Sequence, residues 1–204
     1  MVSTDHRPRA AARTEIERLS GALASAFEHD PAFAWLIPDS SRRLARLARF
    51  FRLELWHVVL PAGAVWTVDG AAGASLELPE GAWRMPIGTQ LAHAPGFLRV
   101  FGARLPHAMA LITKMEHRHV REPHYYIPYV GVVPHAQGQG LGTALLGPTL
   151  ARCDRERVPA YLEGTSERNV ALYERLGFEH LGEFCLGSSP PLWPMRRPPK
   201  QHAG

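Results

Sequence analysis

The chain has 204 residues, of which 46% are apolar and 21% are charged, and its formal net charge is +4. This composition is that of one soluble globular domain with a sizeable core. The arginines are scattered without a long basic run, and no apolar run approaches the roughly 18 residues of a membrane span, so we expect neither a nucleic-acid partner nor a membrane partner.

The N-terminal segment 1–13 is polar and lacks the apolar core of a secretory signal. We expect it to be flexible, residues 14–197 to form one domain, and residues 198–204 to be a flexible tail. Only Cys153 and Cys185 are present, which favours two core residues in a reducing cytoplasm over a disulfide framework. No His/Cys cluster has metal-ligand spacing, so no metal is expected.

In the first half of the chain, apolar spacing predicts helices and turn residues predict their ends. Asp30-Pro31 interrupts the first helix and Pro61 ends the second, whose five arginines are expected on its wet face. The segment 83–100 is weakly patterned. The predicted elements are helices at 14–28, 41–60 and 105–119 and strands at 64–68 and 74–78.

The most informative segment begins with an apolar run, 125–133, that predicts a strand ending at Pro134. A glycine-rich turn, Gln-Gly-Gln-Gly-Leu-Gly over 137–142, then opens an apolar helix. The N–H groups that begin a helix lack internal acceptors and carry partial positive charge, and glycines let a pyrophosphate approach them. The turn therefore predicts a phosphorylated ligand. It lacks the lysine of a nucleotide-hydrolase loop and the Gly-x-Gly-x-x-Gly spacing of a dinucleotide fingerprint.

A second patterned segment follows the glycine helix. A short strand at 160–163 precedes a helix over 170–176, in which Leu172 and Leu176 lie one turn apart. Gly177 is placed to cap that helix, and Phe178 begins the next strand. Further strands are predicted near 179–186 and 192–196.

Together these two segments resemble the signatures of the GCN5-related N-acetyltransferases (the GNAT superfamily). Gln137-x-x-Gly140-x-Gly142 is similar to the coenzyme A loop, and Asn169-x3-Tyr173-Glu-x-Leu-Gly-Phe to the second signature. Leu162-Glu163, among other residues, also looks like puromycin N-acetyltransferase and its relatives. The resemblance implies a three-layer α/β fold with a mixed, mostly antiparallel central sheet flanked by helices on both faces. Such proteins usually open with a strand, which here is short, polar or missing.

The resemblance also implies acetyl-CoA as co-substrate. The pantetheine arm would pair with the strand end, and the pyrophosphate would lie on the glycine turn. Gln137 either contacts the ligand or caps the turn, and Asn169 either contacts pantetheine or caps a helix. The residues expected to bind coenzyme A are Gly131, Val132, Val133, Gln137, Gly138, Gln139, Gly140, Leu141, Gly142, Thr143 and Asn169.

The same resemblance assigns Tyr173 as the general acid that protonates the leaving thiolate. Glu163 is the first candidate for the base, with pairing to an arginine as its alternative role. His119 and His124 titrate in the useful range, but each is expected at the surface. Trp35, Trp83, Tyr126 and Tyr129 either line an amine pocket or pack in the core.

These features predict an acetyl-CoA-dependent N-acetyltransferase that transfers the acetyl group directly to a primary amine of a small molecule, which could be antibiotic-like. A second enzymatic function that fits these features is acetylation of a peptide or protein. A non-catalytic acyl-CoA-binding sensor is the alternative from another class. A homodimer is consistent with the superfamily, although no residue argues for it.

Overall fold

The computed structural model describes residues 7–83 and 87–200. One seven-stranded sheet has the order β1-β2-β3-β4-β5-β7-β6. Every neighbouring pair is antiparallel except β4 with β5, which confirms the mixed, mostly antiparallel sheet. The strands are β1 (Arg9–Ala10), β2 (Ala64–Thr67), β3 (Gly73–Leu78), β4 (Tyr125–Val132), β5 (Ala160–Gly164), β6 (Glu179–His180) and β7 (Trp193–Arg197).

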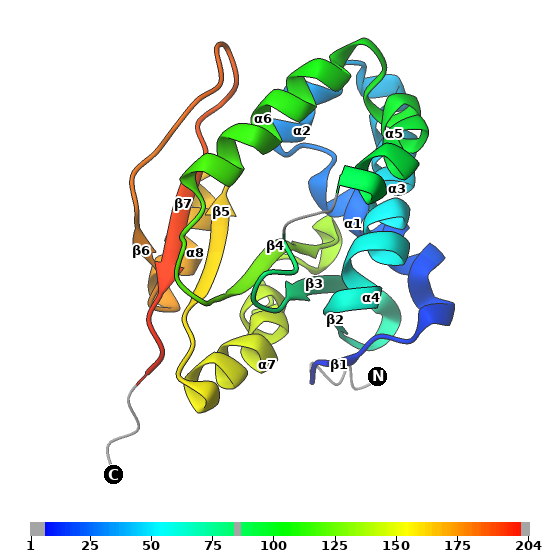
Figure 1. Ribbon diagram of the computed structural model, residues 1–204. Helices are drawn as coiled ribbons and strands as arrows, with labels where there is room; N and C mark the ends of the chain where they lie inside the picture. The colour runs from blue at the N-terminus through cyan, green and yellow to red at the C-terminus, as the bar shows by residue number, and fades with distance from the viewer. Residues whose placement is uncertain (1–6, 84–86, 201–204) are drawn as a thin grey trace.

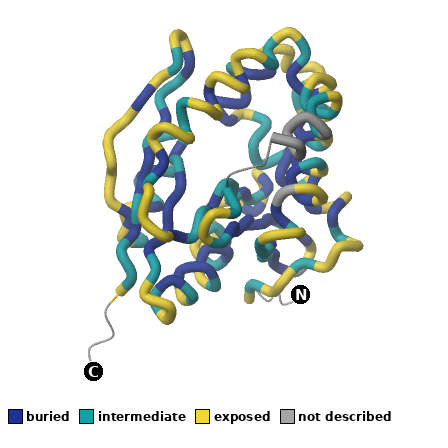
Figure 2. The backbone as a smooth tube through the Cα atoms, in the orientation of Figure 1, coloured by how far each residue is buried: buried dark blue, intermediate teal, exposed yellow. Residues whose placement is uncertain are grey.

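Helices cover both faces of this sheet (Figure 1). They are α1 (Ile16–Phe27), α2 (Pro31–Leu36), α3 (Ser40–Leu53), α4 (Leu60–Ala62), α5 (Ile87–Phe101), α6 (Leu105–Arg118), α7 (Leu141–Glu156) and α8 (Glu167–Arg175). A side chain at Gly131 would meet α1, and one at Gly73 would meet Leu145 of α7, so α1 and α7 pack on opposite faces. Figure 2 shows buried positions concentrated in the strands and along the inner sides of the helices.

Three helical segments differ from the sequence expectation. The weakly patterned segment 83–100 contains most of α5. Pro95 and Gly96 lie inside this helix and weaken the sequence pattern that would predict it. Asp30 begins the helix α2, since its carboxylate accepts the Phe33 N–H at 3.1 Å. The single helix expected over 41–60 passes through a π-helical segment, Glu54–Val59, before α4.

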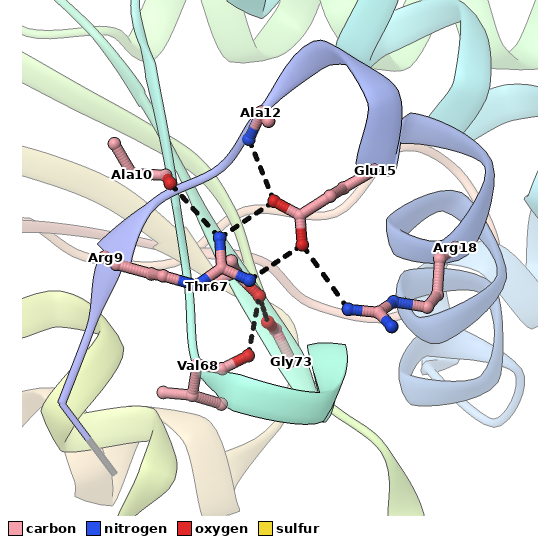
Figure 3. A network of polar contacts seen from close by, with 8 residues as sticks. All are labelled: Arg9, Ala10, Ala12, Glu15, Arg18, Thr67, Val68 and Gly73. Atoms are coloured by element: carbon pink, nitrogen blue, oxygen red, sulfur yellow. Dashed lines mark hydrogen bonds and ion pairs between the residues drawn. The ribbon is translucent and has the colours of Figure 1, made fainter. Parts of the chain in front are cut away.

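The first strand of the fold is present, and it is short and polar (Figure 3). Arg9 of β1 donates two hydrogen bonds of 2.8 Å to the Glu15 carboxylate, which also accepts the Ala12 N–H. The Arg9 hydrogen bond lowers the pKa of Glu15 to about 2. Within the expected flexible segment 1–13, residues 1–6 lie outside the described part of the chain.

A buried carboxylate attaches α7 to the sheet. Glu77 of β3 is 1% exposed and accepts hydrogen bonds from Thr149 at 2.7 Å and Arg152 at 2.6 Å, both on α7. Trp66 of β2 donates a third at 3.1 Å. Because a buried charge is stable only when it is paired, this cluster fixes the position of α7 and hence of its N-terminus.

The C-terminal elements largely follow the prediction. Gly177 has a φ of 91° and ends α8, with its N–H bonded to the Glu174 carbonyl. Cys153 is buried as expected, but Cys185 is exposed and lies outside the strands. The strand expected over 179–186 is limited to β6 and one bridge, Phe184 with Leu192. Residues 201–204 of the expected tail lie outside the described residues.

Candidate active site

An opening between β4 and β5 defines the centre of the site. The two strands pair only at Tyr125 with Ala160 and at Tyr126 with Tyr161, after which they diverge (Figure 1). A register shift between Leu76 and Leu78 places a bulge in the middle of β4. Backbone groups of β4 beyond this point face the opening without β5 partners, so an extended ligand could pair with them.

The glycine turn lies at the end of β4. Gly138 and Gly140 have φ of 80° and 79°, and a side chain at either position would meet nothing within 4 Å. Gly140 is the N-cap of α7, and the first closing hydrogen bond of the helix is donated by the Ala144 N–H at 3.0 Å. The N–H groups of residues 141–143 therefore precede the helical hydrogen-bond ladder and have no acceptor within it.

Gln137 takes the turn-stabilising alternative in this structure. Its side-chain amide donates to the Val132 carbonyl at 3.0 Å, which holds the turn against the end of β4. Nε2 of Gln139 donates to the His135 carbonyl oxygen at 3.5 Å. Both side chains are thus engaged with the local backbone, and the backbone N–H groups are what the turn offers to an anion.

An apolar pocket that is partly open to solvent adjoins the opening between β4 and β5. Its walls come from α1, α2, α3, α5, α6 and β4, and its polar groups come mainly from β5, α8 and their connection. The apolar lining includes Phe27, Phe33, Phe50, Phe101, Leu111, Ile112, Met115 and Ile127, and the polar lining includes Asp30, Tyr129, Glu163, Thr165, Asn169 and Tyr173.

Glu163 lines this pocket, and its carboxyl group has no arginine partner within residues 7–83 and 87–200. Its side chain is 4% exposed, and one oxygen accepts the Tyr126 hydroxyl at 2.9 Å. The other oxygen, Oε1, is buried and has no hydrogen-bond partner among the described residues. Burial raises the pKa of Glu163 to about 7. A carboxyl group with this pKa can exchange a proton near neutral pH.

His119 and His124 do not lie at the surface as expected, because both are buried beside Glu163. Their Nε2 atoms are 2.7 Å apart, and Nδ1 of His119 is 3.8 Å from Oε1 of Glu163. Trp83 stacks on the His119 ring at 3.9 Å. These residues come from three separate segments, which is why their sequence spacing gave no indication of the cluster.

Tyr173 lies at the junction of the pocket and the β4–β5 opening. It is 6% exposed, and its hydroxyl makes no hydrogen bond to any described residue. Burial, with a smaller contribution from the Asp30 carboxyl, raises the pKa of Tyr173 well above its usual value. Tyr173 therefore remains protonated throughout the neutral range.

Two nearby polar residues have structural partners. Asp30, which sequence reasoning treated only as a helix breaker, caps α2 and accepts the Thr165 hydroxyl. Ser166 caps α8 by accepting the Asn169 N–H at 3.3 Å. Asn169 is therefore not the helix cap, and its side chain lines the pocket.

The aromatic residues considered for an amine pocket differ in whether they line the pocket. Tyr129 lines the pocket and packs against Phe27 and Phe51. Tyr126 donates a hydrogen bond to Glu163, which is one of the polar residues that line the pocket. Trp35 is not among the pocket residues, because its indole points toward Ser188, 3.3 Å away.

Within residues 7–83 and 87–200, none of the helices combines the length and apolar character needed to cross a bilayer. In the same part of the chain, no group of three or more His, Cys, Asp or Glu side chains is arranged to hold a metal ion.

A sheet opened beside a glycine turn at a helix N-terminus could hold an extended, phosphorylated ligand, and comparison with known proteins shows a similarity to acetyltransferases. Residues 96–178 match the acetyltransferase (GNAT) family. An uncharacterized N-acetyltransferase of Schizosaccharomyces pombe is 28% identical over 181 residues, which cover 80% of this chain and 70% of that protein. A mycothiol acetyltransferase of Acidothermus cellulolyticus is 33% identical over 62% of this chain but only 39% of its own length.

A solved structure described as histone acetyltransferase HPA2 and related acetyltransferase, from Corynebacterium glutamicum, has a TM-score of 0.73 and 27% identity. The match covers 97% of this chain and 98% of that one. Residues 96–178 thus carry a GNAT acetyltransferase domain, and over most of its length the chain is similar to these acetyltransferases. The narrower resemblance to puromycin N-acetyltransferases stays a prediction.

Proposed function

We propose that this acetyltransferase transfers the acetyl group of acetyl-CoA directly to a primary amine carried on a small, apolar body. The observation that carries the proposal is the apolar pocket whose polar end holds Glu163 and Tyr173, beside the β4–β5 opening. The pocket walls match an aromatic or aliphatic amine better than a polar peptide backbone, which favours a small molecule over a protein acceptor.

Acetyl-CoA would lie across the opening. The pantetheine arm would pair with the free edge of β4 at residues 131–133, and the pyrophosphate would lie on the N–H groups of the glycine turn. Because this placement uses backbone groups, it depends on the bend at Pro134 and on the absence of side chains at Gly138 and Gly140. It leaves the thioester at the mouth of the pocket, near Tyr173.

The proton balance of the reaction assigns two roles. At neutral pH the acceptor arrives as an ammonium ion with three N–H bonds, and the amide product keeps one. Glu163 would take the first proton, which frees the nitrogen lone pair for attack on the thioester carbonyl. Tyr173 would protonate the departing thiolate as it receives the second proton from the nitrogen, so one proton is released to solvent per turnover.

The test is release of free thiol from acetyl-CoA with a panel of amines. The panel contains 2-phenylethylamine, tryptamine and puromycin as apolar acceptors, spermidine as a polar amine, and a short peptide. We expect release with the apolar amines. Release confined to the peptide would contradict the small-molecule proposal, and firm acetyl-CoA binding without release for any acceptor would indicate a sensor.

The pH dependence of turnover tests Glu163. Because Glu163 must be deprotonated to accept a proton and burial raises its pKa to about 7, kcat/KM is expected to fall about tenfold per unit as pH drops below 7. Glu163→Gln should remove the break near pH 7, because only the free amine of the acceptor then reacts and kcat/KM rises until that amine predominates. Glu167→Gln, at an exposed position nearby, is the control. An unchanged break in Glu163→Gln would exclude Glu163 as the base.

A further inference from the structure

Arginines gather in a groove on the outer side of helices α3 and α5, which pack side by side (Figure 1). Arg42, Arg46 and Arg49 follow one another at one-turn intervals along α3, so they lie on the same face of that helix. Arg99, in the last turn of α5, closes the other side. The residues that line this arginine groove are Ser41, Arg42, Ala45, Arg46, Arg49 and Arg99. Because two of them are small, space remains between the guanidinium groups.

The positive charge of the arginine groove is not compensated from within it. No Asp or Glu is among the described residues that line the groove. Arg42 reaches Asp39, beside the groove, at 3.5 Å, and Arg99 donates to a backbone carbonyl. Arg46 and Arg49 make no hydrogen bond or ion pair with any residue that the structure describes. Since like charges one turn apart on a helix repel each other, an anion in the groove would stabilise it.

Arginines elsewhere in the fold are arranged differently. Those that contact a carboxylate include Arg9, Arg152, Arg196 and Arg197. Arg43 lies on α3 outside the groove, and its guanidinium donates to three backbone carbonyls. The arginines that support the fold thus have partners within it. The two central arginines of the groove have none among the described residues, which leaves their hydrogen-bond donors free for a ligand.

We propose that the arginine groove binds a chain of phosphate groups, either free or carried by a nucleoside. Guanidinium groups hold phosphoryl oxygens through paired, charge-assisted hydrogen bonds. At about 1.5 Å per residue, Arg42 and Arg49 are about 10 Å apart along α3, and a linear anion fits this length better than a single phosphate. A phosphate chain also carries more charge over that length than an extended acidic peptide, whose side chains on one face are about 7 Å apart.

The arginine groove lies behind the acceptor pocket, although its ligand does not depend on acetyl transfer. Phe50 of α3 and Phe101 of α5 line the pocket, and their ring centroids are 5.8 Å apart. An anion that bridges Arg46 and Arg49 to Arg99 would hold these two helices together. Because such a ligand binds the folded protein and not the unfolded chain, it raises the melting temperature.

Isothermal titration of the 204-residue chain with inorganic triphosphate tests the proposal. Saturating coenzyme A is present throughout, so that the glycine turn is occupied. We expect saturable binding that weakens about tenfold or more in Arg46→Gln/Arg49→Gln. Arg13→Gln/Arg155→Gln removes two positive charges at exposed positions elsewhere and should bind as the wild type does. Titration with ATP then compares the nucleoside-carried chain with the free one.

A second pair of substitutions separates specific phosphate contacts from attraction by charge alone. Arg46→Lys/Arg49→Lys keeps both charges but removes the planar fork of donors, and should weaken triphosphate binding about fivefold. Without ligand, each variant should melt near the wild type, and triphosphate should raise the melting temperature of the wild type but not of the glutamine variant.

Three results would overturn the proposal. The first is the absence of triphosphate and ATP binding to the wild type. The second is wild-type affinity in the lysine or the glutamine variant, which would show that the groove is only a solvated helix face. The third is an oligoglutamate peptide that binds the groove as tightly as triphosphate, which would indicate an acidic protein partner. None of these results bears on thiol release, so the proposed function and this inference can fail separately.

Discussion

Replacing Gly140 by glutamate is expected to abolish coenzyme A binding while the protein remains folded. Gly140 begins α7 with a φ of 79°, and its side-chain direction is open. A glutamate there would place a negative charge against the pyrophosphate and a side chain in the space that the ligand must enter. It would also strain the left-handed backbone by about 1–2 kcal/mol. The measurement is isothermal titration with coenzyme A.

Two variants separate the effect of the negative charge from the effect of the backbone strain. Gly147→Glu adds the same charge at an exposed position two turns along α7, where a side chain also meets nothing, and should bind as the wild type does. Gly140→Ala introduces the strain without the charge and should weaken binding much less than glutamate. Wild-type affinity in Gly140→Glu would show that the pyrophosphate lies elsewhere.

Tyr173→Phe is expected to lower kcat at least tenfold and to leave the dissociation constant of acetyl-CoA nearly unchanged. The variant removes one hydroxyl group that has no structural hydrogen bond among the described residues, so the fold should be unaffected. The loss arises because the thiolate must then leave without a proton, and general acids contribute about 10²–10⁴-fold. Single-turnover thiol release and equilibrium binding measure the two quantities separately.

Tyr125→Phe is the matched control for this variant. Its hydroxyl donates to Glu156 at 2.6 Å on the outside of the sheet, so it too removes one tyrosine hydroxyl, but away from the pocket. Turnover should stay near that of the wild type. If Tyr173→Phe also keeps its rate, another group protonates the thiolate.

The features that the sequence predicted well are local ones. The glycine turn and Gly177 belong to short segments in which the spacing of residues determines the backbone, so a strand, a turn and a helix follow from few positions. The same holds for α7 and β5. The polar first strand was harder to predict because two residues, Arg9 and Ala10, are held by pairing with β2 and not by their own pattern.

The features that could not be predicted depend on tertiary contacts. Glu163 was identified as a base candidate, but its pairing with His119 and His124 arises only when three segments pack together. Helix α5 was missed because Gly96 weakens the helical pattern, whereas in the fold this position packs closely against Leu53, 2.8 Å from where a side chain would begin. Trp35 was placed in the acceptor site by its residue type, although α2 turns it toward Ser188.

The measurement that tests the central proposal most directly is the initial rate of thiol release as acetyl-CoA and 2-phenylethylamine are varied together. Direct transfer from acetyl-CoA at the β4–β5 opening to an amine in the adjoining pocket requires both to be bound at once. We therefore expect release that depends on the amine and intersecting double-reciprocal lines. Parallel lines, which indicate an acyl-enzyme, or release that does not depend on the amine would contradict the account.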